Sequence, residues 1–213
     1  MENNEVDFNE FVGWFIALMF PFAAFGLMEV TKMPIISAAI YYLVFGIYLR
    51  YKMDGRLPYF KPQLSKVKLE SFIFLLVAIL CAYLYITQVK PVDIKTSEMV
   101  INLFVFAMIN GTFEHLVWVN IYDLAGQRKK YLGVIASTIY VGLIHAMFWS
   151  KFIPAPNGGN AFLFILSQVL VLWVPLRIYA KTKDLTIWSI QHILYNVLAV
   201  VIGGFGISMY LFH

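Results

Sequence analysis

The sequence predicts an all-α protein: a polytopic membrane helical bundle of about seven transmembrane helices, with eight as the alternative number. Of the 213 residues, 61% are hydrophobic and only 13% are charged, whereas a soluble domain is roughly 45–50% apolar and about 25% charged. The mean hydropathy is +0.76. The apolar residues also gather into runs of about 20, the length that an α-helix needs to cross a bilayer.

Seven such runs follow one another along the chain. The first contains Pro21, where we expect a kink. The second begins at Pro34, and proline is tolerated there because the backbone N–H that it lacks would have no partner in the first turn of a helix. A basic loop, residues 50–68, follows the second run. The glycines of Gly203-Gly204-Phe205-Gly206 are expected to interrupt the last run, so a short eighth element is the alternative there. The runs cover approximately residues 11–30, 34–49, 69–87, 97–124, 131–150, 161–179 and 185–212.

The distribution of positive charge predicts how the chain is oriented in the membrane. Lys and Arg number 12 in the loops on one side, which also holds the N-terminus, and 4 in the loops on the other. The positive-inside rule therefore predicts a cytoplasmic N-terminus. The formal net charge of +4 has the same origin, and we expect no nucleic acid as partner. No linker divides the chain, which favours a single integral membrane domain over residues 1–213.

Two further observations restrict the classes of protein and site. The only cysteine is Cys81, inside the third apolar run, so an internal disulfide and a cysteine-based zinc site are excluded. Residues 1–10 are acidic and lack the positive region of a signal peptide. We therefore expect the first apolar segment to be retained.

The fourth apolar run carries ionisable side chains where contact with lipid would be costly. Glu114 and His115 are adjacent, and Asn110, Glu114 and Trp118 are four apart in turn, so these three share one helix face. Ionisable groups in membrane segments are rare and usually face a protein interior or a watery cavity. We interpret this stretch as a functional site. The alternative is a buried carboxylic acid that bonds a neighbouring helix, a role usually filled by Ser, Thr, Asn or Gln.

Two later runs carry imidazoles that could complete this site. His145 lies in the fifth run, and His192 and Asn196 are four apart in the seventh, so the latter two share a face. Each pattern is a weak signal by itself. However, three of the four histidines of the chain lie in apolar runs, and the fourth, His213, is the last residue.

Together these residues resemble the motifs of the CAAX protease and bacteriocin-processing (CPBP, or Abi) intramembrane proteases. That pattern places Glu-Glu-x-x-x-Arg, Phe-x-x-x-His and His-x-x-x-Asn on separate membrane helices. Glu114 corresponds to the first Glu, His145 to the His of the second motif, and His192 with Asn196 matches the third motif in full. The similarity covers approximately residues 102–202, within a family-like catalytic core at about residues 97–212.

Three positions depart from the family pattern. His115 stands at the second Glu, Val119 at the Arg and Val141 at the Phe, whereas Trp118 occupies a position that is usually aromatic. The Glu and the Arg of the pattern are four apart, as in a helical ion pair. Losing one partner leaves a buried charge, whereas losing both together can be neutral. We therefore interpret the replacement as loss of a structural pair, with a decayed, inactive enzyme as the alternative.

The resemblance implies an intramembrane endopeptidase that acts on a membrane-associated or lipidated protein or peptide within the lipid bilayer. In the family the first Glu and the middle His activate a water, and the last His and the Asn stabilise the oxyanion. By this correspondence, Glu114 is the general base with His145, and His192 and Asn196 donate to the oxyanion. The supporting residues would be Asn110, His115 and Trp118. We expect the protein in the plasma membrane of a prokaryote.

Alternatives to this hypothesis remain. No cofactor is expected, but zinc could bind Glu114, His145 and His192 and keep an open position, although the helical His-Glu-x-x-His pattern is absent. The alternative function is a catalytically inactive CPBP-like membrane scaffold or a bacteriocin-immunity protein. A transporter or channel would also place polar groups near the middle of the bilayer, but the sequence shows no repeated half.

Overall fold

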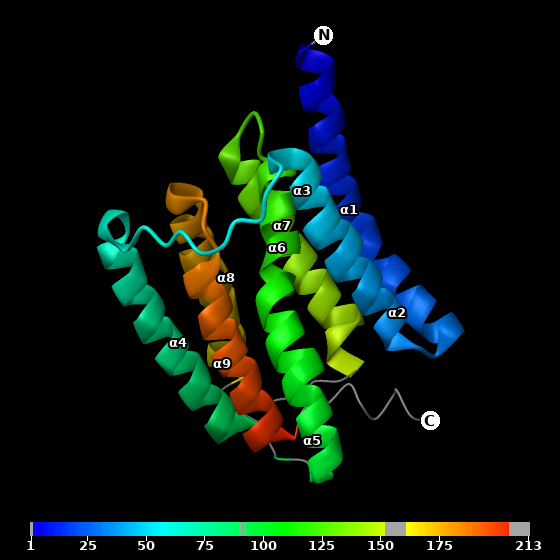
Figure 1. Ribbon diagram of the computed structural model, residues 1–213, viewed down its shortest axis with the longest axis vertical. Helices are drawn as coiled ribbons and strands as arrows, with labels where there is room; N and C mark the ends of the chain where they lie inside the picture. Colours follow the sequence, from blue (N-terminus) through cyan, green and yellow to red (C-terminus); the bar gives the residue numbers. More distant parts are fainter. Residues whose placement is uncertain (1, 90, 92, 152–160, 205–213) are drawn as a thin grey trace. The chain divides into compact units, whose positions relative to one another are not determined.

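Figure 1 shows the protein as a computed structural model, which describes residues 2–89, 91, 93–151 and 161–204. The regular structure of these residues is helical, which confirms the predicted all-α class. Two compact units are present, Met1–Leu57 with Leu116–Lys151, and Pro58–His115 with Phe152–Phe212. The single domain expected from the sequence stays a prediction.

Six helices among the described residues are long and apolar enough to cross a membrane, as a multi-pass membrane protein requires. They coincide with six of the seven runs seen in the sequence. These helices are Glu5–Thr31, Pro34–Asp54, Lys68–Gln88, Thr96–Ala125, Lys130–Met147 and Thr186–Gly203. The remaining run corresponds to α8 (Ala161–Thr182), whose side chains are described from Leu166 onward.

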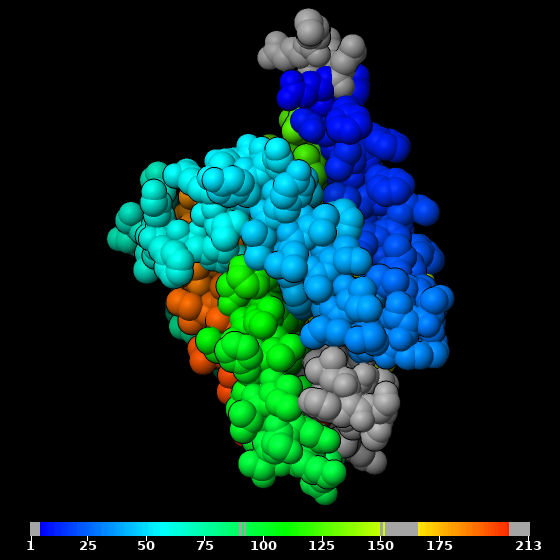
Figure 2. Space-filling view, turned by 45° about the vertical axis from the view of Figure 1, so that its right-hand side comes forward, coloured from blue at the N-terminus to red at the C-terminus, as the bar shows by residue number. Residues whose placement is uncertain are grey.

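The first unit contains α1, the second span and α7. Helix α1 (Glu2–Thr31) begins earlier than its apolar run and continues through Pro21, and it packs along α7 (Lys130–Met147). The large apolar side chains that α1 exposes are of the kind that lipid covers in a membrane protein; α1 is the dark-blue helix in Figure 2. These side chains are Phe8, Phe11, Phe15, Leu18, Met19, Phe22 and Val30.

The second span consists of three consecutive helical segments. They are α2 (Pro34–Ala39), η1 (Ile40–Tyr48) and α3 (Leu49–Asp54). Segment η1 is a π-helix, in which each N–H bonds to the carbonyl five residues back rather than four. Since α3 ends at Asp54, the prediction that a basic loop begins at residue 50 was wrong: the helix continues for one more turn.

The second unit contains α4 and α8, which lie side by side in Figure 1, together with α9 and the fourth span as far as His115. Its elements are α4 (Lys68–Gln88), α5 (Thr96–Asn102), the π-helix η3 (Leu103–Asn110), the first residues of α6 (Gly111–Ala125), α8 and α9 (Thr186–Gly203). Helix α9 packs against η3 and α4. The π-helix therefore ends directly before the turn that carries Glu114.

Two glycines let helices of this unit approach closely. A Cβ at Gly111 would lie 2.8 Å from the Ile193 Cα atom, so α6 and α9 could not keep their spacing with a larger residue there. A Cβ at Gly203 would lie 2.2 Å from the Tyr85 hydroxyl. Helix α9 ends at Gly203, and Gly204 caps it with a φ of 66°, a left-handed conformation that glycine adopts without strain. The interruption predicted at these glycines is confirmed; the short eighth element would lie outside the described residues.

Candidate active site

Glu114 lies in the first turn of α6 and is 2% exposed. Its Oε2 accepts a hydrogen bond of 3.0 Å from the Asn110 Nδ2 group and lies 2.9 Å from the His192 Nε2 atom. Asn110, one turn earlier, ends the π-helix η3. The structure therefore brings together three of the residues singled out from the sequence, within the second unit.

His192 and Asn196 lie one turn apart on α9, and both are buried. The Nδ2 atom of Asn196 has no hydrogen-bond partner among the described residues. A buried donor left without a partner costs about 1–3 kcal/mol, and such a group in a folded protein calls for an explanation. The structure thus presents an unused N–H donor on the helix face that also carries His192.

His115 is completely buried between two rings. Its imidazole lies 4.3 Å from the Trp188 ring, and also 4.3 Å from the His192 ring, which it meets edge-on with an interplanar angle of 85°. Edge-to-face contacts of this kind are a favourable arrangement for aromatic rings. His115 therefore packs against His192, and its supporting role stays a prediction.

Tyr59 is a site neighbour that the sequence analysis missed. Its hydroxyl donates a hydrogen bond of 2.6 Å to the carbonyl of Thr112, two residues before Glu114. The Ser189 hydroxyl, on α9, donates to the same carbonyl at 3.4 Å. These bonds tie the turn that carries Glu114 to α9 and to the loop after α3. Nothing in the sequence pattern around Tyr59 distinguishes it from other loop residues.

His145 and Trp118 lie in the first unit. The Nδ1 atom of His145 lies 2.8 Å from the Val141 carbonyl oxygen; a carbonyl can only accept, so Nδ1 is the donor in this contact. The Trp118 ring lies 6.2 Å from the His145 ring, and its N–H donates to the Tyr41 hydroxyl at 3.0 Å. The approach of His145 to Glu114 would join the two units and stays a prediction.

Arg50 is a second buried polar centre, also missed from the sequence. Its side chain is 1% exposed. It donates hydrogen bonds from Nε to Asn120 Oδ1 at 2.8 Å, from one terminal nitrogen to Asp54 at 2.6 Å, and from the other to Asp123 at 3.0 Å. Asn120 in turn donates to the carbonyls of Phe45 and Gly46, inside η1. The sequence did carry one signal for this buried polar centre: two polar residues, Asn120 and Asp123, lie three apart in an apolar run.

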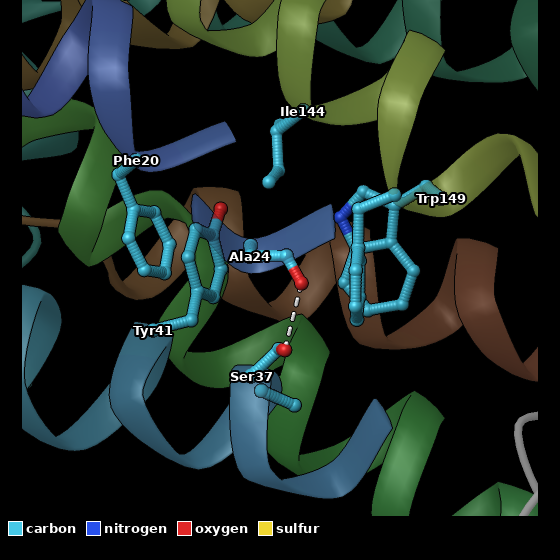
Figure 3. A pocket seen from close by; sticks show the side chains of 8 residues that line it. Phe20, Ala24, Ser37, Tyr41, Ile144 and Trp149 are labelled. Atoms are coloured by element: carbon cyan, nitrogen blue, oxygen red, sulfur yellow. Dashed lines mark hydrogen bonds between the residues drawn. The ribbon is translucent and has the colours of Figure 1, made fainter. Parts of the chain in front are cut away.

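Figure 3 shows a pocket in the first unit that has no such chemistry. Ser37, in the lower part of the view, donates a 2.9 Å hydrogen bond to the Ala24 carbonyl. No carboxylate, imidazole or thiol lines it, so we do not assign a reaction to it. The lining residues are Phe20, Ala24, Ser37, Ala38, Tyr41, Ile144, Phe148 and Trp149.

Within the described part of the chain, no three His, Cys, Asp or Glu side chains form a group that could hold a metal ion. The zinc hypothesis for Glu114, His145 and His192 stays a prediction. Comparison with known proteins finds no matching family model, curated protein or solved structure. The resemblance to the CPBP proteases therefore depends on the motif residues alone.

Proposed function

We propose that this protein is an intramembrane endopeptidase that hydrolyses a peptide bond with a glutamate-activated water. The observation that carries the proposal is the 2.9 Å contact between Glu114 and His192 in a buried site, with Asn196 one turn further along α9. Peptide hydrolysis needs a base beside the water and donors directed at the developing negative charge. A carboxylate, an imidazole and an amide supply both without a nucleophilic Ser or Cys.

The hydrogen-bond geometry fits the roles that the family resemblance implies. When Glu114 is ionised it can only accept, so His192 Nε2 carries the proton that faces it. To serve an oxyanion, this N–H would have to turn from the Glu114 carboxylate to the developing negative charge, with the Asn196 amide as the second donor. Glu114 would then act on the water, with His145 completing the base. The proposed substrate is a membrane-associated or lipidated peptide or protein.

Replacing Asn196 with alanine tests the oxyanion role. We expect cleavage of a membrane-associated peptide by the detergent-solubilised protein to fall about 10²–10³-fold, the usual effect of losing one oxyanion donor. Because Asn196 Nδ2 has no partner among the described residues, the substitution breaks no hydrogen bond of that atom and should not lower the free energy of unfolding. Leu194→Ala, an exposed position on the same helix, is the matched control. Unchanged cleavage by Asn196→Ala would refute the oxyanion role.

We further propose that the N-terminus and the loop around Arg56 face the cytoplasm of a prokaryote, as the distribution of Lys and Arg supports. In a Cys81→Ser background, a membrane-impermeant maleimide should label Lys95→Cys in intact cells. It should label Arg56→Cys only after the membrane is permeabilised. Labelling of Arg56→Cys from outside would contradict this orientation.

A scaffold or immunity protein without catalysis is the second candidate. It is favoured by the near-complete burial of Glu114 and by the two hydrogen bonds that its Oε2 accepts, as a purely structural contact between helices would show. Glu114→Gln separates the candidates because it keeps the shape of the side chain but cannot act as the base. Retention of biological function by Glu114→Gln would support the scaffold.

A further inference from the structure

The connection between α3 and α4 contains a segment, Pro58–Lys68, that we call the strap. Three hydrogen bonds fix the backbone of its first residues to the residues at the start of α9. The Leu185 N–H donates to the Pro58 carbonyl at 2.7 Å, the Phe60 N–H donates to the Thr186 hydroxyl at 2.7 Å, and the Lys61 N–H donates to Asp184 at 2.8 Å. The strap is therefore held at a defined place on the second unit.

Phe60, within the strap, has an unusual backbone conformation and an unusually exposed side chain. Its φ is 65°, a left-handed conformation that is uncommon for residues with a large side chain. Its side chain is 89% exposed. Strained backbone persists only where the surroundings hold it, and it is often associated with function. The hydrogen bonds around Phe60 thus hold its backbone in the left-handed conformation, and in this conformation the aromatic ring is exposed.

The strap also carries three positively charged side chains. Lys61, Lys66 and Lys68 are exposed, and the sequence has no Asp or Glu from Gly55 to Leu69. The nearby carboxylate of Asp184 is 6% exposed and accepts hydrogen bonds from backbone N–H groups. The outer surface of the strap is therefore basic and aromatic.

Helix α4 begins at the end of the strap, and its exposed side chains indicate which kind of molecule covers the outer surface of the strap. Its length and composition suit a membrane span, and a row of its apolar side chains is exposed from the first turn onward. These side chains are Leu69, Phe72, Ile73, Leu75, Leu76 and Ile79. If lipid tails cover this row, the headgroups of the same lipids lie beside Lys68 and the strap. Aromatic residues favour this interface, and clustered lysines there attract anionic headgroups.

We propose that the strap is a docking surface for anionic lipid headgroups, with Phe60 placed among the headgroups and the three lysines binding their phosphates. The probe is phosphatidylglycerol, compared with zwitterionic phosphatidylcholine. Each lipid is titrated into the purified full-length protein in detergent, and bound lipids are counted by native mass spectrometry at low and high salt.

We expect the wild-type protein to bind phosphatidylglycerol about tenfold more tightly than phosphatidylcholine, since each lysine near an anionic surface contributes to binding. High salt should reduce this preference. The triple variant Lys61→Gln, Lys66→Gln, Lys68→Gln should lose it. The matched triple variant Lys52→Gln, Lys129→Gln, Lys130→Gln, which removes the same number of exposed lysines, should keep it.

Two outcomes would overturn the proposal. One is equal binding of the two lipids by the wild type, and the other is equal loss of preference in the two triple variants. Phe60→Ala should weaken the binding of both lipids by a similar factor, because an aromatic ring at the interface acts without regard to headgroup charge. No change for either lipid would refute the role of the ring. The thermal stability of each variant shows that it is folded.

Discussion

Replacing Glu114 with alanine is expected to abolish peptide cleavage. The substitution removes the proposed base, a group that typically contributes about 10²–10⁴-fold to rate. It also removes the acceptor that Asn110 and His192 now share, so the remaining site residues lose their alignment. His145→Ala should have the same effect if that ring completes the base. The measurement is the rate of cleavage of a membrane-associated peptide by purified protein in detergent.

The control for this experiment is Glu29→Ala, which removes an exposed carboxylate bonded to Lys32. It should cleave at the wild-type rate. Equal cleavage by the wild type and Glu114→Ala would end the glutamate mechanism. A metal chelator should have little effect, whereas inhibition that added zinc reverses would favour the metal hypothesis.

Replacing Arg50 with leucine should lower the free energy of unfolding by about 3–5 kcal/mol, the cost of removing one partner from a buried ion pair. The reason is that Asn120 and Asp123 would lose the donors that Arg50 provides. Arg50→Lys should recover only part of the loss, because an ammonium cannot reproduce the planar arrangement of guanidinium donors. Thermal unfolding in detergent measures both variants.

Arg128→Leu is the matched control for Arg50→Leu. Arg128 also pairs with two acids, Asp7 and Glu10, but its side chain is 49% exposed. Exposed ion pairs contribute about 0–1 kcal/mol, so this variant should unfold close to the wild type. If Arg50→Leu also unfolds close to the wild type, the buried network is not a major contributor to stability.

Hydropathy predicted the fold class and the membrane-crossing segments because long apolar runs have few other structures available to them. It failed where a polar residue belongs to a membrane helix. Arg50 was assigned to a loop because it ended an apolar run, yet it is buried in α3. Its partner Asn120 lies 70 residues away in the sequence, and no local pattern shows that such a partner exists.

The candidate site was predictable in part, because spacing of four residues places Asn110 with Glu114 and His192 with Asn196 on common helix faces. The direct contact between Glu114 and His192 was not predicted. It depends on how closely α6 and α9 approach, which the missing side chain at Gly111 permits. The hydrogen bond from Tyr59 to Thr112 depends in the same way on the path of a loop.

The π-helical segments η1 and η3 have a consequence for how this chain tolerates changes in length. A π-helix contains more residues than an α-helix over the same number of hydrogen-bonded turns. Removing one residue from Leu103–Asn110 could therefore be absorbed by converting that stretch to α-helix, with the segment from Gly111 onward left in its register. The same holds for Ile40–Tyr48. At these two places the chain can absorb a deletion by changing helix type, whereas a deletion between Thr186 and Gln191 in α9 would rotate His192 away from Glu114.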